Sequence, residues 1–304
     1  MHFDDAKNEM LQILRRTESR DLAKLIDWLK HSGDIDDFLV DNQRAILHSI
    51  AEDLRSCLPV DAVFPSETLA IQKTQKNPNP TVHVDAFLYD EDTVDSLCEE
   101  GKMSRNYCVS CGSHRTAPLE FISHSFSIPE LQFLFYHVLP DLTGKLVVDV
   151  GSRLGTVLYG GFLYSAAAQL VGVEINEEFV KLQTMTVEKY GFSDRVQVIH
   201  ANICSQAALV QNSDVLIMNN VFEYFIEPKD QVRAWQFISQ NFRKKGALLV
   251  TVPSIQESLM SLQETSAAST IGYWLQEVSL NYSAYLQGDA DPDSIKQIHL
   301  YMVL

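Results

Sequence analysis

The sequence predicts an α/β protein: a doubly wound, mostly parallel seven-stranded sheet with an antiparallel edge pair, preceded by an N-terminal helical region. In the C-terminal half, five short apolar runs alternate with stretches of helical periodicity. This alternation is typical of parallel strands that helices cover on both faces. Two further apolar runs close the chain with no helix between them, so we expect them to pair antiparallel at one edge.

The seven predicted strands are KLVVDV, LVGVEI, RVQVIHA, SDVLIMNN, GALLVTVP, IGYWLQEVSL and IKQIHLYMVL. The apolar stretch from Val157 to Val173 is too short for a membrane span, and we expect a buried helix that runs into a buried strand. Another helix precedes the first strand. Ser127 is its predicted N-cap, Pro129 lies in its first turn, and Glu130 completes a capping box.

Residues 1–60 are predicted to be helical. In SRDLAKLIDWLKHSG the leucine and isoleucine residues recur at the spacing of one helical face, with Ser19 as the N-cap and Gly33 as the end. A second helix is predicted to follow Asp41. No residue pattern here indicates chemistry, so we interpret this region as a helical cap or interaction module.

Residues 61–125 are predicted to form a polar, acidic connecting segment, and residues 126–304 the sheet domain. Between Asp85 and Glu100 there are seven acidic residues and no Lys or Arg. Such a run favours a solvated face, with attraction of a basic partner as the alternative.

Composition limits the functions that the chain can have. The net charge is −16, which argues against direct nucleic-acid binding because that binding depends on Lys and Arg at the phosphates. An acidic surface suits small molecules or a basic protein segment. The first ten residues are acidic and lack an apolar core, so no signal peptide is predicted. Five cysteines without such a signal favour reduced thiols in the cytoplasm or nucleus, and no membrane association is expected.

Polar residues and glycines at the strand ends indicate a ligand site. Asp149 ends the first strand, Gly151 permits a tight turn, and Gly155 lets the next helix approach closely. Glu174 ends the second strand nineteen residues beyond Gly155, where an acid can accept hydrogen bonds from both ribose hydroxyls. Asn202 follows the third strand, and its amide can read the amino edge of an adenine.

Two further sets of residues extend this predicted site. Ile203 can lie against the adenine ring. Asn219 and Asn220 end the fourth strand, over the middle of the site.

These motifs together resemble one family. Asp149-x-Gly151-x-x-x-Gly155, followed by GVEIN, HANI, DVLIMNNVFEYF and RKKGALLVTVP, resembles the superfamily of seven-strand S-adenosylmethionine-dependent methyltransferases over roughly residues 126–304. Each motif alone is weak, and five in this order are specific. The resemblance implies S-adenosylmethionine as the cofactor, methyl transfer as the reaction, and a sheet whose last strand is inserted antiparallel.

The resemblance also implies a role for each matching residue. Gly151 and Gly155 would lie under the methionine part of the cofactor, and Ser152 between them is a further cofactor-binding candidate. Asp149 would orient the loop or the cofactor ammonium, and Glu174 would hold the ribose.

Two positions depart from the family pattern. Asn202 stands where the family usually has Asp, and its carbonyl oxygen can still accept from adenine N6. Arg153 stands where the family commonly has Gly. A side chain is tolerated there if it points away, and the cation could lie near the cofactor carboxylate. We predict an altered but functional loop, with a loop that no longer binds as the alternative.

Dinucleotide binding is a weaker alternative. Its fingerprint places the last glycine three residues after the second, whereas Gly151 and Gly155 are four apart and follow an acid.

The segment after the fourth strand offers few catalytic groups. Glu223 is a candidate base or an anchor for a cationic substrate nitrogen, with Asn220 beside it, and a surface carboxylate is the alternative role for Glu223. A protein with a basic segment is the expected acceptor. A small-molecule acceptor and a non-catalytic cofactor-binding scaffold are the alternatives.

Cys108-x-x-Cys111 resembles half of a zinc site, which Cys98 and His114 could complete. No second C-x-x-C motif exists, so we expect no bound metal. We interpret this segment instead as a loop over the cofactor mouth that brings His124 and its neighbour Ser125 near the methyl donor.

Overall fold

The structure is a computed structural model with two compact units, Met1–Ile46 and Leu47–Leu304. This division differs from the predicted regions 1–60, 61–125 and 126–304, because it groups the connecting segment with the sheet. The structure describes residues 3–60, 62–65, 67–68, 81–109, 116–118, 120–222, 225–260, 262, 274–285 and 292–304.

The N-terminal unit is helical, as predicted, but its helix ends differ from the prediction. It contains α1 (Phe3–Arg16), α2 (Ser19–His31) and the first part of α3 (Gly33–Cys57). Glu18, one residue earlier than predicted, is the N-cap of α2. Ser32 ends that helix, and Gly33 begins α3, which runs through the predicted start near residue 41. A glycine between two helical stretches can therefore start the second helix instead of closing the first.

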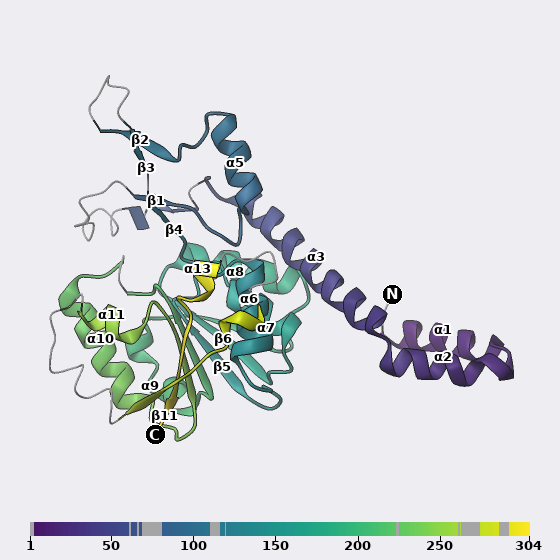
Figure 1. The fold of residues 1–304 in the computed structure, drawn as a ribbon. Coiled ribbons are helices and arrows are strands. Elements are labelled where there is room, and N and C mark those ends of the chain that lie inside the picture. Colours follow the sequence, from purple (N-terminus) through teal and green to yellow (C-terminus); the bar gives the residue numbers. More distant parts are fainter. Residues whose placement is uncertain are drawn as a thin grey trace. The chain divides into compact units, whose positions relative to one another are not determined.

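The second unit contains the predicted seven-stranded sheet, in the order β10-β11-β9-β8-β5-β6-β7 (Figure 1). Strands β5 to β9 are parallel, and β11 runs antiparallel to both of its neighbours. The fold class and the inserted last strand are thus confirmed. The strands are β5 (Leu146–Val150), β6 (Gln169–Glu174), β7 (Val196–His200), β8 (Val215–Asn219), β9 (Leu248–Val252), β10 (Leu275–Val278) and β11 (His299–Val303).

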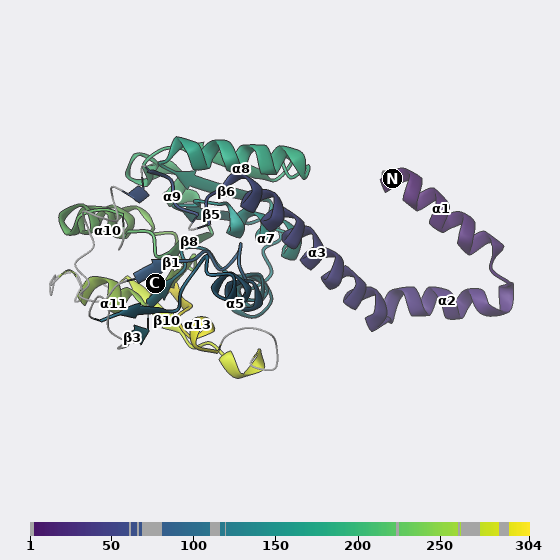
Figure 2. The same cartoon turned by 90° about the horizontal axis from the view of Figure 1, so that it is seen from above.

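Helices cover both faces of this sheet, as Figures 1 and 2 show. The predicted capping box at Ser127 is present, with both of its hydrogen bonds to Glu130. Two short helical turns, η3 and α13, lie between the last two strands, where no helix was predicted. The helical elements are α6 (Ile128–Phe133), η1 (Leu134–Val138), α7 (Thr156–Tyr164), α8 (Glu177–Lys189), η2 (Ile203–Ser205), α9 (Ala207–Asn212), α10 (Pro228–Asn241), α11 (Ile255–Met260), η3 (Tyr282–Ala284) and α13 (Pro292–Ile295).

The core lies on both sides of the central strands. Val147 and Val148 are neighbours in β5 with side chains on opposite faces, and both are fully buried. The same holds for Leu216 and Ile217 in β8. Within the described residues, no helix is both long and apolar enough to cross a bilayer.

The connecting segment contains more regular structure than its sequence indicates. β1 (Thr81–His83) pairs in parallel with β4 (Glu120–Ile122), and β2 (Asn106–Cys108) pairs antiparallel with β3 (Thr116–Pro118). Helix α5 (Glu91–Glu99) takes up much of the acidic run. The expectation of a solvated face holds for most of that run and is wrong for Asp85, which is 3% exposed.

Gly172 in β6 fixes the approach of the loop that follows β5. A Cβ atom at Gly172 would lie 2.7 Å from both the Ser152 hydroxyl oxygen and Leu158 Cδ1. We therefore expect Gly172→Ala to lower the free energy of unfolding by about 1–3 kcal/mol, the usual effect of overpacking. Urea unfolding followed by circular dichroism measures this.

Gly33→Ala is the matched control for Gly172→Ala. No atom lies within 4 Å of a Cβ placed there, and Gly33 is in a helix, so the substitution should not destabilise. An unchanged unfolding free energy in Gly172→Ala would contradict the proposed contact with the loop.

Candidate functional site

The loop after β5 turns through three residues with left-handed backbone. Gly151, Arg153 and Gly155 have φ angles of 68°, 44° and 81°. A Cβ atom at Gly151 would lie 2.3 Å from Val221 Cγ2, and one at Gly155 would lie 2.7 Å from the Tyr159 hydroxyl. Both glycines are thus required by conformation and by close approach, as the sequence indicates.

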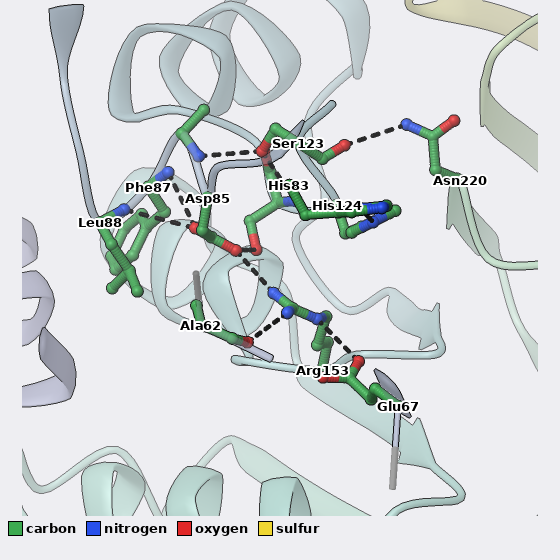
Figure 3. Close-up of polar contacts among 12 residues, drawn as sticks. Ala62, Glu67, His83, Asp85, Phe87, Leu88, Ser123, His124, Arg153 and Asn220 are labelled. Carbon is green, nitrogen blue, oxygen red and sulfur yellow. Dashed lines mark hydrogen bonds and ion pairs between the residues drawn. The ribbon is translucent and has the colours of Figure 1, made fainter. Parts of the chain in front are cut away.

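Arg153 keeps the left-handed conformation that a glycine adopts easily. For an L-residue this costs roughly 1–2 kcal/mol. Its side chain points away from the loop into the connecting segment (Figure 3). The guanidinium donates from Nη1 to Asp85 at 2.8 Å, from Nε to Glu67 at 3.1 Å, and from Nη2 to the Ala62 carbonyl. Two protein carboxylates hold this cation, so the structure adds no support to the suggested contact with the cofactor carboxylate.

This ion-pair cluster is buried. Arg153, Glu67 and Asp85 are 6%, 8% and 3% exposed. Burial raises the pKa of the Glu67 carboxyl, and the nearby Arg153 cation opposes that rise. The guanidinium also lies 5.0 Å from the ring centroid of Phe179 in α8. A buried cation with two carboxylate partners fastens the loop to a distant part of the chain.

Asp85 is the branch point of the hydrogen bonds in this cluster. Its Oδ1 accepts from the backbone N–H groups of Phe87 and Leu88 at 3.1 and 3.3 Å. Its Oδ2 accepts from the Ser125 hydroxyl at 2.6 Å as well as from Arg153. One carboxylate thus joins residues 85–88 and the C-terminal end of the connecting segment to the loop after β5.

Glu174 fixes the backbone of the same loop. Its Oε2 accepts from Arg153 N–H and its Oε1 from Asn176 N–H, both at 2.8 Å. Burial raises the pKa of this carboxyl, while the hydrogen bonds from Asn176 and Arg153 oppose the rise. A carboxylate offers about four acceptor positions, and the Ile175 N–H also donates to this one, so about one remains for a predicted ribose hydroxyl.

Gln183 in α8 holds the other side of the loop. Its Nε2 donates to the Arg153 carbonyl at 2.7 Å, and its Oε1 accepts from the Ser152 hydroxyl at 2.8 Å. Gln183 is fully buried. The predicted loop residue Ser152 therefore serves the loop's own conformation.

Asp149 is a buried acid at the end of β5. Burial raises the pKa of its carboxyl well above the ordinary value, and the neighbouring Glu174 carboxylate adds to the rise. These two predicted cofactor residues are thus brought together, and the Glu174 carboxylate makes ionisation of Asp149 costlier.

The predicted adenine residues lie at the start of η2. Asn202 is exposed, and its Oδ1 accepts from Cys204 N–H at 2.9 Å, which caps the turn. One of the two lone pairs on that oxygen is therefore already used. Ile203 is buried in the core on the side of α10.

The end of β8 brings the two asparagines against the connecting segment. Asn220 has a φ of 48°, and its Nδ2 donates to the Ser123 carbonyl at 3.3 Å and to Asn219 Oδ1 at 3.2 Å. Glu223 lies outside the described residues. The expectation that the stretch around residue 124 covers this edge of the sheet agrees with the Asn220 contact.

Several residues of the cluster were missed by sequence reasoning. The sequence next to each of them gives little sign of a buried polar residue, and their partners are far away in sequence. These residues are Glu67, Asp85 and Gln183. One signal for Asp85 was present, because Val84 precedes it and Phe87 and Leu88 follow it closely.

Only some of the candidate metal ligands lie among the residues that the structure describes. Cys111 and His114 lie outside the described residues, and Cys108 is exposed. Among the residues that the structure describes, no group of three or more His, Cys, Asp or Glu is arranged to hold a metal ion.

A comparison with protein families identifies the domain that contains this site. Residues 148–250 match the family model described as "Methyltransferase domain". The chain carries a class I S-adenosylmethionine-dependent methyltransferase domain. Its cofactor is S-adenosylmethionine, which decides against the dinucleotide alternative. The match spans the loop after β5, Glu174, Asn202 and both asparagines at the end of β8.

Solved methyltransferase structures are distant in sequence. The O-methyltransferase from Bacillus cereus in complex with SAH has 12% identity, with 60% of this chain and 84% of that chain covered and a TM-score of 0.42. The RNA methyltransferase from Salinibacter ruber in complex with S-adenosyl-L-homocysteine has 15% identity, coverage of 59% and 92%, and a TM-score of 0.38. No curated protein matches the sequence.

Arg153 tests how far the methyltransferase loop depends on the buried ion pairs. Arg153→Gly relieves the left-handed strain but leaves two buried carboxylates without their cation. Breaking a buried pair in this way costs about 3–5 kcal/mol, which exceeds the strain. We expect a lower free energy of unfolding in urea titrations.

The matched control is the triple variant that combines Arg153→Gly with Glu67→Gln and Asp85→Asn. Because the amides remove the uncompensated charge, part of the lost stability should return. Arg153→Gly with wild-type stability would show that the ion pairs contribute nothing to the fold.

The raised pKa of Asp149 predicts a pH-dependent stability. The folded state holds this proton more tightly than the unfolded state, whose carboxyl titrates near 3.8. The stabilising contribution is complete below that pH and is lost as pH rises through the folded-state pKa. Asp149→Asn does not titrate, so its melting temperature should rise relative to that of wild type as pH increases above 4.

Asp214→Asn is the control of opposite sign. Burial raises the pKa of Asp214, but hydrogen bonds from Leu146 N–H and Lys244 outweigh burial and lower it overall. That variant should lose stability relative to wild type as pH rises up to about 3.8, and above that pH the difference should stay constant. The same pH trend in both variants would contradict the assignment for Asp149.

Proposed function

We propose that this methyltransferase acts on a protein acceptor that carries a basic segment. The charge balance supports this, with 40 Asp and Glu against 24 Lys and Arg. A surface of that sign attracts cationic partners and repels phosphates. Localisation in the cytoplasm or nucleus is part of the same proposal.

The N-terminal helices offer a surface for such a protein. Helix α2 contains no fully buried residue, although its apolar side chains recur at helical spacing. Apolar side chains that stay exposed on several successive helices favour a protein-binding surface. The exposed large apolar residues of this unit are Met10, Leu11, Ile13, Ile26, Trp28, Phe38 and Leu39.

Within the site, the roles proposed for the cofactor residues follow the family motifs. Gly151 and Gly155 would lie under the methionine part, Asp149 would face the ammonium, and Glu174 would accept from the ribose hydroxyls. Glu223 is proposed as the base or the anchor for a cationic nitrogen. The remaining acceptor position on Glu174 supports its role.

Transfer of labelled methyl groups tests the proposal. Purified protein is incubated with methyl-tritiated S-adenosylmethionine and cell extract, and the products are separated by size. We expect label in a protein fraction. Glu223→Gln should reduce that labelling by about 10²-fold or more, the usual scale for a general base, with unchanged cofactor affinity.

Glu227→Gln is the matched control, because Glu227 is an exposed acid four residues further along that makes no side-chain capping bond. It should label as well as wild type. Label found only below about 3 kDa would favour a small-molecule acceptor. Wild type that binds cofactor but labels nothing would favour a non-catalytic scaffold.

A further inference from the structure

The N-terminal unit leaves its apolar side chains accessible. Among residues 4–46, whose side-chain exposure the structure describes, no apolar side chain is buried. Phe38 and Leu39 in α3 are 72% and 51% exposed. Short helices are marginal in water unless an apolar face packs against something. Two large apolar neighbours that stay this exposed therefore indicate a surface that a partner covers.

Acidic side chains border Phe38 and Leu39. Phe38 follows Asp34 by four residues and precedes Asp41 by three, so both carboxylates are its neighbours on the helix. Leu39 follows Asp36 by three residues and has that carboxylate as its neighbour. We call this surface the α3 docking face. It consists of Asp34, Asp36, Phe38, Leu39 and Asp41.

The acids of this face have no basic neighbours in the sequence. From Asp34 to Asp41 there are four Asp and no Lys or Arg, and none of these four forms an ion pair in the described contacts. Helix α2 differs, because its Asp21 lies 3.2 Å from Arg20 and 3.3 Å from Lys24. Acids three or four residues apart on a helix repel one another, so the start of α3 favours a cation from outside.

Trp28 in α2 adds a second aromatic ring beside the face. Its Nε1 donates to Asp34 Oδ2 at 3.1 Å, which holds the indole next to a residue one helical turn before Phe38. Trp28 remains 45% exposed. Aromatic side chains are enriched at protein interfaces because they bury a large apolar area. The face therefore offers apolar contact and negative charge together.

Charge decides between a second copy of this chain and a basic partner. A second copy would bring its own net charge of −16 and its own aspartates to the face. Like charges across an interface oppose association, whereas Lys and Arg complement carboxylates. Because the apolar and acidic groups of the face recur at helical spacing, the complementary partner is a helix with an apolar stripe flanked by Lys or Arg.

We infer that the α3 docking face binds a basic amphipathic helix of the acceptor protein, an inference that rests on the proposed function. Apolar side chains of that helix contact Phe38, Leu39 and Trp28. Its Lys and Arg side chains pair with the aspartates. The face thus selects the acceptor by its charge and by its apolar pattern, separately from the chemistry of methyl transfer.

Peptide binding to the full-length chain tests the face. The probe is a fluorescein-labelled peptide in which Leu and Lys recur at helical spacing, and fluorescence anisotropy measures its affinity. The docking-face variant combines Phe38→Ser with Asp41→Asn and should bind about tenfold or more weakly, the scale of a lost interface anchor. Added salt should weaken wild-type binding. Circular dichroism should be unchanged, because both side chains are exposed.

The matched control variant combines Met185→Ser with Glu188→Gln. Met185 is 57% exposed on α8 and precedes the exposed Glu188 by three residues, the same spacing as Phe38 and Asp41. This variant loses the same kinds of side chain on a different helix. It should bind the peptide as tightly as wild type.

The labelling assay with methyl-tritiated S-adenosylmethionine tests whether the occupant is the acceptor. At limiting extract, the docking-face variant should label protein about tenfold more slowly than wild type. Its rate should approach that of wild type as extract is increased, because docking raises affinity for the acceptor and leaves the chemical step alone. Affinity for S-adenosylhomocysteine in calorimetry should stay unchanged.

Four results would overturn the inference. Equal peptide affinity in wild type and the docking-face variant would remove the face. A wild-type chain that sediments as a dimer, with the docking-face variant as a monomer, would show that a second copy covers it. Weaker peptide binding with unchanged labelling would remove the acceptor as the occupant and leave the methyltransferase. Wild type that labels nothing would remove the proposed function and the acceptor with it, while peptide affinity reports separately on the face.

Discussion

The buried ion pairs of Arg153 are the interaction on which the site depends. A left-handed arginine in the cofactor loop costs roughly 1–2 kcal/mol, and it persists because its guanidinium binds Asp85, Glu67 and a backbone carbonyl. The same residue offers its backbone N–H to Glu174 and its carbonyl to Gln183. One residue thus joins the connecting segment, the loop and α8.

This arrangement explains why the connecting segment belongs to the sheet domain. Asp85 ties the middle and the C-terminal end of that segment to the loop, and the Ser123 carbonyl in turn contacts Asn220 at the end of β8.

The sheet could be predicted from the sequence because each strand is a local apolar run, and all seven strands are present. The two glycines of the loop, at 151 and 155, could be predicted for the same reason, since a turn shows in adjacent residues. The destination of the Arg153 side chain could not, because its partners are 68 and 86 residues away. The burial of Asp85 could not be predicted from the sequence either, because charged residues in an acidic run are usually exposed.

The central claim is that a loop carrying Arg153 in place of glycine still binds S-adenosylmethionine, because the side chain is held away from the cofactor. Calorimetric titration of the purified protein with S-adenosylmethionine and S-adenosylhomocysteine tests it most directly. The account predicts saturable binding of both at one site per chain. Absence of binding by a protein that is folded and stable would contradict it and show that the arginine closes the loop.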